Sequence, residues 1–414
     1  MNMSRILMSC MAIVLLPGCI STPDPGAWPP QSVERNEWID KTTGHKVIRL
    51  SRREGNNEVF YFHQNPFTET GDKMVFLGST DKGRCAFTVN LQSFEIRQIT
   101  DRNVGFEVVA PKSRQLFYVN GDSVYATHLD TLETREIAKI PHHYTWGRGL
   151  SVNSDETLLA GCYCKGEETY YQSKMPRNQW IRALWQAKLP NALYTIDIAT
   201  GAIREIYHEN EWLGHVQFSP ADPSLIEFCH EGPAREVERM WIIRSDGTGL
   251  KKVLEKKYAR EIQTHEFWSP DGTQIWSDFQ IPAFPARIAR FMEAFTYPKH
   301  HLACTDVRTW ETMLYPFKMR YASRHFNISR DQSIFCGDGE GGSFRLCPSG
   351  KWIFLYRIVN GKLRIEKLCS MAGHSWKSYP EPNSHFTPDG RWVVFQSDAG
   401  GTLQVYAVSV ARTE

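Results

Sequence analysis

Five polar residues stand at the same position of a pattern that recurs along the chain. Each precedes by four residues a Ser or Thr that opens a turn, and the five are Gln64, His215, His265, His325 and Asn383. Imidazole and amide groups bind divalent cations, and a neutral imidazole accepts a proton near neutral pH. The alternative is that each histidine is a packed structural residue. The shared register favours one site for proton transfer or cation binding.

A second group of polar residues lies near the end of the chain. Glu381, Asn383 and His385 are spaced by two, so on an extended strand their side chains would share one face. A carboxylate, an amide oxygen and an imidazole beside His325 suit a divalent cation such as manganese, calcium or zinc. Alternatively, Glu381 pairs with an Arg or Lys, and the site holds no metal.

Several other chemistries lack their motifs. The sequence has no Gly-x-Ser-x-Gly turn of a serine hydrolase and no Gly-rich phosphate loop that ends in Lys-Ser or Lys-Thr. His230-Glu231 and His265-Glu266 lack the second histidine of a zinc-protease helix. The formal net charge of +2 gives no electrostatic footprint for nucleic acid, so no nucleic-acid partner is expected.

The recurring pattern predicts the elements that must position the polar residues. An aromatic or apolar residue, Ser or Thr and a Pro-Asp-Gly-like turn precede a short β-branched or aromatic run. A hairpin closed by Thr-Gly follows, as at 193–206, so each unit makes four antiparallel strands. Seven copies occur, at residues 67–71, 110–112, 152–155, 218–220, 268–272, 328–331 and 386–390. The fold is therefore expected to be all-β, a seven-bladed β-propeller.

The two ends of the chain are expected to meet in the last blade. The seventh unit runs out at Val408, one strand short, and residues 45–50 form a strand that belongs to no blade. Pairing the two would close the ring and remove exposed strand edges. The innermost strands line the axis of a propeller, so the register residues would surround its central channel. Helix-like insertions at 180–185 and 287–292 are either packing arms or walls over the channel mouth.

The N-terminus has the features of a lipoprotein signal. Arg5 precedes an apolar run, residues 6–16, which is too short to span a bilayer and ends in Leu-Pro-Gly-Cys at Cys19. We expect a signal peptide over 1–18, a lipidated Cys19 with a tether over 19–40, and the propeller over 41–414. The protein would then lie in the bacterial cell envelope, attached to the membrane through the lipid alone. The alternative is a cleaved signal peptide whose cysteine is incidental.

Several stretches of the sequence resemble the oligogalacturonate lyase family, whose members are seven-bladed propellers. The similarity covers nearly the whole chain after the N-terminal signal, in the same order. The matching stretches are 61–65 (Tyr-Phe-His-Gln-Asn), 215–220 (His-Val-Gln-Phe-Ser-Pro), 229–233 (Cys-His-Glu-Gly-Pro), 239–243 (Arg-Met-Trp-Ile-Ile), 264–268 (Thr-His-Glu-Phe-Trp) and 337–339 (Gly-Asp-Gly). The resemblance implies that His265 is the general base, that Arg239 assists it, and that His325 is the first manganese ligand.

One segment departs from the family pattern. Where the family has Gln-x-x-His-Pro-His, with three further metal ligands, residues 378–383 read Ser-Tyr-Pro-Glu-Pro-Asn. Ser378, Glu381 and Asn383 therefore replace the three ligands, and His385 is an addition. Exchanging an imidazole for a carboxylate adds negative charge, which favours a harder ion.

The resemblance also implies a reaction, the β-elimination of a uronate. A base removes the C5 proton, charge builds on the C6 carboxylate, and the C4 oxygen departs. The substrate would be an acidic oligosaccharide derived from pectin, with Arg239 able to clamp a carboxylate. The expected substrate contacts are His63, Gln64, His215 and His230. For His215 and His230, the alternative is a purely structural role. The rival functions are a lyase for another uronate oligosaccharide and a TolB-like propeller that binds without catalysis. The oligomeric state cannot be inferred from the sequence.

Overall fold

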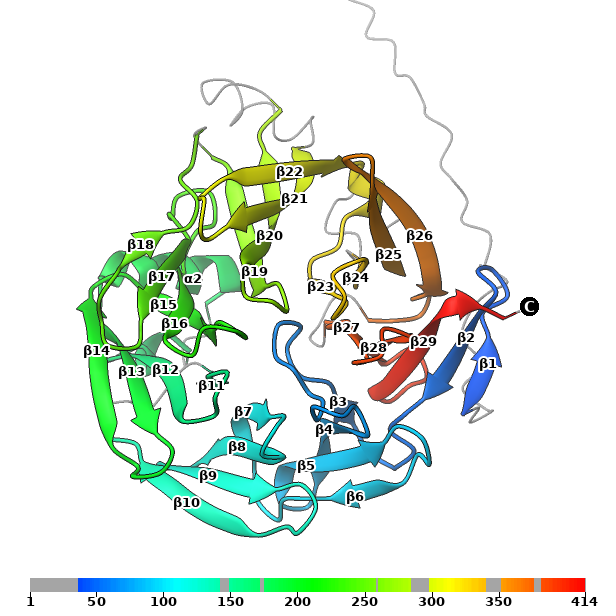
Figure 1. The fold of residues 1–414 in the computed structure, drawn as a ribbon, viewed down its shortest axis with the longest axis horizontal. Coiled ribbons are helices and arrows are strands. Elements are labelled where there is room, and N and C mark those ends of the chain that lie inside the picture. Colours follow the sequence, from blue (N-terminus) through cyan, green and yellow to red (C-terminus); the bar gives the residue numbers. More distant parts are fainter. Residues whose placement is uncertain are drawn as a thin grey trace, which may run out of the picture.

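The computed structural model describes residues 36–141, 149–171, 175–257, 260–283, 298–339, 351–375 and 381–413. Seven antiparallel sheets stand around a central axis as the blades of a propeller (Figure 1). In six of the blades, the strand nearest to the axis is followed outward by the next strands along the chain. The predicted fold class is therefore confirmed.

The strands of the first four blades follow one another without crossing. Blade 1 contains β3 (Asn57–Glu58), β4 (Lys73–Thr80), β5 (Gly83–Asn90) and β6 (Ile96–Gln98). Blade 2 contains β7 (Gly105–Ala110), β8 (Gln115–Asn120), β9 (Ser123–His128) and β10 (Thr134–Lys139). Blade 3 contains β11 (Ser151–Val152), β12 (Leu158–Cys164), β13 (Asn191–Asp197) and β14 (Ile203–Glu209). Blade 4 contains β15 (Leu213–Phe218), β16 (Leu225–His230), β17 (Met240–Arg244) and β18 (Lys251–Lys252).

The remaining three blades complete the ring. Blade 5 contains β19 (Ile262–Trp268), β20 (Gln274–Ile281), β21 (Lys299–Asp306) and β22 (Thr312–Phe317). Blade 6 contains β23 (Phe326–Ile328), β24 (Phe335–Gly337), β25 (Trp352–Val359) and β26 (Lys362–Ser370). Blade 7 contains β27 (His385–Phe386), β28 (Trp392–Ser397) and β29 (Gln404–Arg412), followed by β2 (His45–Arg49) and β1 (Glu37–Ile39).

Blade 7 is built from both ends of the chain, as predicted. Strand β2 pairs antiparallel with β29, with Val47 opposite Val408, and both side chains are fully buried. This pairing joins the first described strands to the last ones and covers the edge of β29. The N-terminal signal, Cys19 and most of the predicted tether lie outside the described residues.

The recurring Ser or Thr has a structural role in the turns. In blade 5, the Ser269 hydroxyl donates to the Asp271 carboxylate at 2.6 Å and accepts the backbone N–H of Gln274 at 3.0 Å. The same pair of hydrogen bonds forms at Ser329 and at Thr387. These side chains satisfy backbone groups of the turn between the two inner strands, which explains why the pattern repeats.

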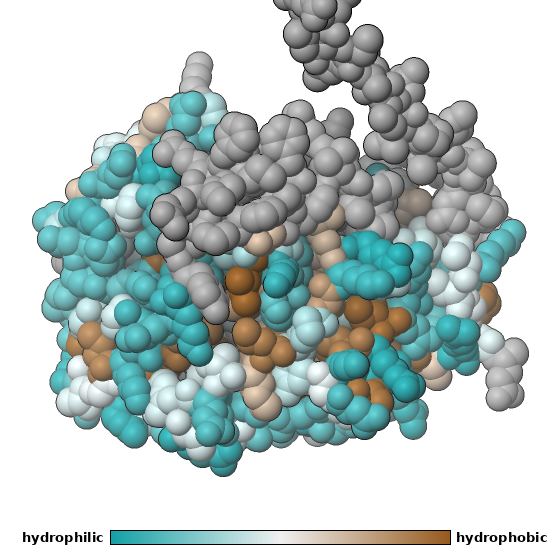
Figure 2. Space-filling view, turned by 90° about the horizontal axis from the view of Figure 1, so that it is seen from above, coloured by the Kyte–Doolittle hydropathy of each residue, from teal (hydrophilic) through white to brown (hydrophobic). Residues whose placement is uncertain are grey.

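The core lies between neighbouring blades. Val75 and Leu77 of β4 belong to one buried cluster with Val109, Leu116 and Tyr118 of blade 2. Such face-to-face packing of adjacent sheets holds the inner strands in place around the axis. Seen edge-on, the surface is mostly hydrophilic, with hydrophobic residues scattered among the polar ones (Figure 2).

The first predicted insertion is helical. Residues 180–185 lie within α2 (Arg177–Ala187), and α1 (Glu168–Tyr171) precedes it. A separate 3₁₀ turn, Met319–Tyr321, lies between blades 5 and 6. The buried Leu184 of α2 packs in a cluster with Trp212, and Arg182 pairs with Glu236 at 2.6 Å. This helix is therefore a packing arm on blade 4. The second predicted insertion, residues 287–292, lies outside the described part of the chain. Among the described residues, no helix has the length and apolar character needed to cross a membrane.

Candidate active site

Two of the register residues, His215 and His265, sit on bulged inner strands. In β15 and β19 the pairing register shifts at Gly214/Gln217 and at Thr264/Phe267, beside His215 and His265. His215 and His265 have φ values of 49° and 57°, and Asn383 has 48°. Left-handed backbone is rare outside glycine, and a bulge with such a residue redirects the side chain. Side chains at this register are therefore directed by backbone geometry that strand periodicity does not predict.

His265 is placed to act as a base. Its ring meets the ring of His325 edge-on at 4.8 Å between centroids, and Phe62 lies 6.2 Å away. Burial, then the neighbouring His325 and Arg239, lower the pKa of His265 well below its ordinary value. Nδ1 of this ring has no hydrogen-bond partner in the described structure. The imidazole is thus neutral at neutral pH, the form that accepts a proton.

Arg239 precedes β17 and is only 5% exposed. Its Nε donates to Glu266 Oε2 at 2.9 Å and its Nη2 to Glu266 Oε1 at 3.2 Å, while Nη1 donates to Glu231 Oε2 at 3.1 Å. Two carboxylates of the protein therefore surround the buried guanidinium, and the substrate clamp stays a prediction. The charge of Arg239 also acts on the adjacent His265.

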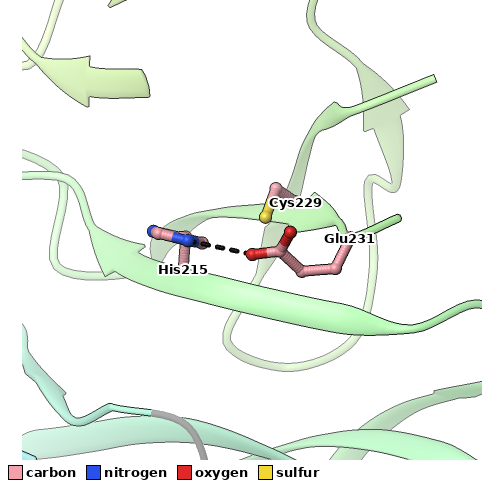
Figure 3. A group of neighbouring side chains, drawn as sticks. All are labelled: His215, Cys229 and Glu231. Carbon is pink, nitrogen blue, oxygen red and sulfur yellow. Dashed lines mark ion pairs between the residues drawn. The ribbon is translucent and has the colours of Figure 1, made fainter. Parts of the chain in front are cut away.

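His215 and Glu231 point toward one another next to Cys229 (Figure 3). The distance from His215 Nε2 to Glu231 Oε1 is 2.9 Å, and the possible ligand atoms of all three residues lie within 4.8 Å of one another. Burial raises the pKa of the Cys229 thiol, and the carboxylate of Glu231 already pairs with His215 and Arg239. A cation here would face the positive charge of Arg239. This group is a hydrogen-bond network that holds His215.

A cavity of about 430 Å³ opens beside this network. Three of the predicted substrate contacts, His63, Gln64 and His215, line it. The other lining residues are Tyr61, Arg84, Gly105, Phe106, Glu107, Gly149, Leu150, Gly214, Val216 and Glu231. His230 is not among them, because its Nε2 pairs with Glu209 at 2.7 Å and its ring stacks on Trp241. For His230, the structural alternative fits the geometry.

His325 is fully buried and held from two sides. Its Nδ1 lies 2.6 Å from Oδ2 of Asp338, whose Oδ1 accepts the backbone N–H of His325 at 3.0 Å. The ring stacks on Phe62 at 4.6 Å. Nδ1 therefore donates to the Asp338 carboxylate, and Nε2 lies 3.5 Å from Oε2 of Glu381.

The residues around His325 include donor atoms that suit a divalent cation. Nε2 of His325, Oδ1 of Asn383 and Nδ1 of His385 are buried without hydrogen-bond partners in the described structure. With the Glu381 carboxylate they offer imidazole, amide and carboxylate ligands, and these donor types suit a divalent cation. Glu381 also forms an ion pair with Arg324, which was the alternative raised from the sequence.

His385 is placed differently from the prediction. Its Nε2 lies 3.2 Å from the backbone oxygen of Tyr61, and burial lowers its pKa to about 4. The regular alternation expected for 381–385 fails because Asn383 has left-handed backbone, and β27 begins only at His385. Among the described residues, His385 and Glu381 do not gather with a third His, Cys, Asp or Glu at one point. Of the predicted ligands, His325 and Glu381 are thus the pair whose donor atoms lie close together, and Ser378 lies outside the described residues.

Three acidic residues complete the site and were not assigned roles from the sequence. Asp338 orients His325, while Glu231 and Glu266 hold Arg239. Two of them stand next to the predicted His230 and His265, and Asp338 is part of the Gly-Asp-Gly stretch. The sequence signal that could have identified them is an acidic residue next to a candidate histidine or inside a stretch that matches the family. Their partners come from other strands, so the pairing required the fold.

Comparison with known proteins places the chain among lyases. A family model described as oligogalacturonate lyase matches residues 31–291. The oligogalacturonide lyase of Pectobacterium atrosepticum and the oligogalacturonate lyase of Dickeya dadantii are 26% and 27% identical, over 90% of this chain and 95% of their own length.

Solved structures agree with the sequence comparison. An oligogalacturonate lyase in complex with manganese matches with a TM-score of 0.77 and 27% identity, over 91% of this chain and 96% of that chain. The oligogalacturonate lyase of Vibrio parahaemolyticus gives a TM-score of 0.78 and 26% identity over the same shares. The chain belongs to the oligogalacturonate lyase family of polysaccharide lyases.

Proposed function

We propose that this protein cleaves uronate-containing oligosaccharides, namely pectin-derived oligogalacturonides, by β-elimination. The observation that carries the proposal is a buried, neutral His265 with the Arg239–Glu266 pair behind it, in a chain of this lyase family. The nearby cavity supplies room for the sugars. No hydrolytic nucleophile is needed for this chemistry, since the bond breaks when the C5 proton leaves.

His265 accepts the C5 proton in this proposal. The electron pair of the C5–H bond becomes the C4–C5 double bond. The C4–O bond breaks with its electron pair on oxygen, and the departing oxygen of the rest of the oligosaccharide takes a proton from solvent. Burial, with His325 and Arg239 beside the ring, lowers the pKa of His265 and keeps it neutral, and Arg239 is itself held by Glu266 and Glu231. His63, Gln64 and His215 bind the sugar at the cavity wall. Since the C5 proton is weakly acidic, the charge on the C6 carboxylate must be stabilised.

His325, Glu381 and Asn383 would hold a divalent cation next to His265, with His385 as a further donor if Asn383 and its neighbours shift. A cation bound there would polarise the C6 carboxylate and stabilise the enolate-like transition state. The support is the set of buried atoms without partners and the manganese complex of a relative. Manganese is the proposed ion, and calcium and zinc are the alternatives to test.

A lyase for a different uronate oligosaccharide is the second candidate. It is favoured by one observation, the Glu381–Arg324 ion pair beside His325. Glu381 and Asn383 replace imidazoles at positions that the family pattern gives to the metal. A changed cation site would hold the carboxylate of a differently configured sugar.

We also propose that the protein is lipidated at Cys19 and lies in the bacterial cell envelope. The support is the apolar run that ends in Leu-Pro-Gly-Cys. The lipid would be its only attachment to the membrane.

The proposed activity is tested by incubating the protein with a panel of acidic oligosaccharides. The expected product is a 4,5-unsaturated uronate, seen by its ultraviolet absorbance, or the keto sugar into which it rearranges. Turnover of galacturonate oligomers in preference to other uronates supports the first candidate. Turnover of another uronate alone supports the second.

A further inference from the structure

Phe106 occupies the register position of blade 2. It stands four residues before Ala110, where the pattern of that blade places its turn, as His215 and His265 do in blades 4 and 5. The register of β7 shifts at Gly105/Val108, and Phe106 has φ 52°. Phe106 therefore has the bulged, left-handed backbone of the register residues His215 and His265.

The ring of Phe106 is presented to the cavity and not to the core. Phe106 is 38% exposed, whereas Phe60, Phe62 and Phe76 are fully buried. It lines the same cavity as His63, Gln64 and His215. A strained backbone that displays an apolar ring to solvent has no packing gain to explain it.

Two glycines accompany Phe106 in the wall of the cavity. Gly105 and Gly149 line the cavity with Phe106, and a Cβ added to Gly149 would meet nothing within 4 Å. Gly149 is itself the register residue of blade 3, four positions before Asn153. The ring therefore borders open space large enough for a ligand.

The polar groups of the cavity surround this apolar surface. His63 and His215 lie 5.8 Å apart by ring centroids. Arg84 lines the cavity and donates two hydrogen bonds of 2.9 Å to Glu107, the residue after Phe106. An apolar platform with a few converging polar groups is typical of a small-molecule site. A galacto-configured sugar fits it, because its axial C4 oxygen leaves an apolar patch of C–H groups on the other face, which packs on the electron-rich face of an aromatic ring.

We propose that Phe106 is the stacking platform of a further sugar subsite, which binds a uronate unit beyond the two that the breaking C4–O bond joins. Tyr61 links this cavity to the His265–His325 group, because it lines the cavity and its ring lies 5.5 Å from that of His215 and 5.1 Å from that of His325. A sugar on Phe106 would then belong to the same oligomer as the reacting unit, and digalacturonate would leave this subsite empty. This inference rests on the proposed function and assigns a residue that sets the preference for chain length.

The test measures binding and turnover of digalacturonate and trigalacturonate by the wild type and Phe106 variants. Phe106→Ala should weaken trigalacturonate binding roughly 5- to 10-fold, with a matching rise in KM and kcat within about twofold. The effect on digalacturonate should be smaller. Phe106→Tyr should restore affinity, because it keeps the ring. Phe106→Asn is a second variant, since asparagine tolerates left-handed backbone and preserves folding.

The matched control is Phe94→Ala. Phe94 is also a phenylalanine with left-handed backbone, φ 59°, but lies in the outer hairpin of blade 1 against Arg52. The Phe94→Ala variant should bind trigalacturonate like the wild type. If the wild type binds and cleaves trigalacturonate but Phe106→Ala and Phe106→Asn bind it equally well, the subsite is overturned and the proposed function stands. If the wild type neither binds nor cleaves any galacturonate oligomer, the proposed function fails and the subsite fails with it.

Discussion

Asp338 and His325 form a buried carboxylate–imidazole pair, with 2.6 Å between Oδ2 and Nδ1 and neither side chain exposed. The same carboxylate accepts the backbone N–H of His325 at 3.0 Å and that of Asn383 at 3.3 Å. One side chain on blade 6 thus orients two candidate cation ligands that belong to neighbouring blades. Such outer partners set the tautomer and direction of a metal-binding histidine.

Asp338→Asn should therefore weaken cation binding. The amide keeps the size of the side chain but loses the charge that fixes the Nδ1 hydrogen, so affinity for manganese should fall roughly 10- to 100-fold. Calorimetric titration of chelator-treated protein with manganese, calcium and zinc measures it. Asp331→Asn, in a turn of the same blade, is the control and should bind like the wild type. Equal affinities for Asp338→Asn and the wild type would remove this role, and a wild type that binds no ion would remove the proposed cation site.

Replacing Glu266 should destabilise the fold. Arg239 is buried with two hydrogen bonds to this carboxylate, so Glu266→Ala leaves a buried charge short of its partner and should cost about 3–5 kcal/mol of unfolding free energy. Glu69→Ala, which breaks the exposed pair with Arg330, should cost less than about 1 kcal/mol. Chemical unfolding of both variants measures the difference. Similar small losses in the two would mean that the buried pair contributes little.

The fold could be predicted because its determinants are local. In the turns of blades 5, 6 and 7 the Ser or Thr and the Asp make hydrogen bonds within six residues, so the pattern is visible along the sequence. The missing last strand and the unassigned strand at 45–50 likewise predicted the closure of the ring. The family resemblance, confirmed by the comparisons, added the residues around His265.

The details of the site depend on contacts that the sequence does not display. The left-handed backbone at His265 and Asn383 comes from bulges, and it broke the alternation expected for 381–385. Arg239 meets Glu266 only because β17 and β19 belong to adjacent blades. A long side chain with several possible partners therefore could not be assigned from spacing alone.

Stability should fall as the pH is lowered from neutral. Burial lowers the pKa of His300 and of His385 to about 4, from an ordinary value of 6.5. Between pH 6.5 and 4 the unfolded chain binds protons that the folded chain does not, so this contribution is complete above 6.5 and is lost as the pH falls toward 4. Unfolding midpoints at several pH values measure the slope. His300→Gln should flatten it, whereas His208→Gln on the surface should not, and an unchanged slope in His300→Gln would contradict the assignment.

Cys19→Ser tests the proposed anchor. Without the thiol no lipid can be attached, so the protein should move to the soluble fraction of the envelope or remain unprocessed. Fractionation of cells that express the wild type and the variant, with detection of both protein forms, gives the result. A processed Cys19→Ser protein that stays with the membrane would show that the attachment is not a lipid on this residue.

The central claim is that His265 removes the C5 proton of a uronate. The most direct measurement follows turnover of galacturonate oligomers by wild-type protein and by His265→Ala, with unfolding and cation content measured on the same samples. The account predicts an unsaturated or keto product from the wild type and a loss of at least roughly 10²-fold in kcat for His265→Ala, with fold and cation content retained. A saturated, hydrolytic product, or a His265→Ala variant that turns over like the wild type, would contradict it.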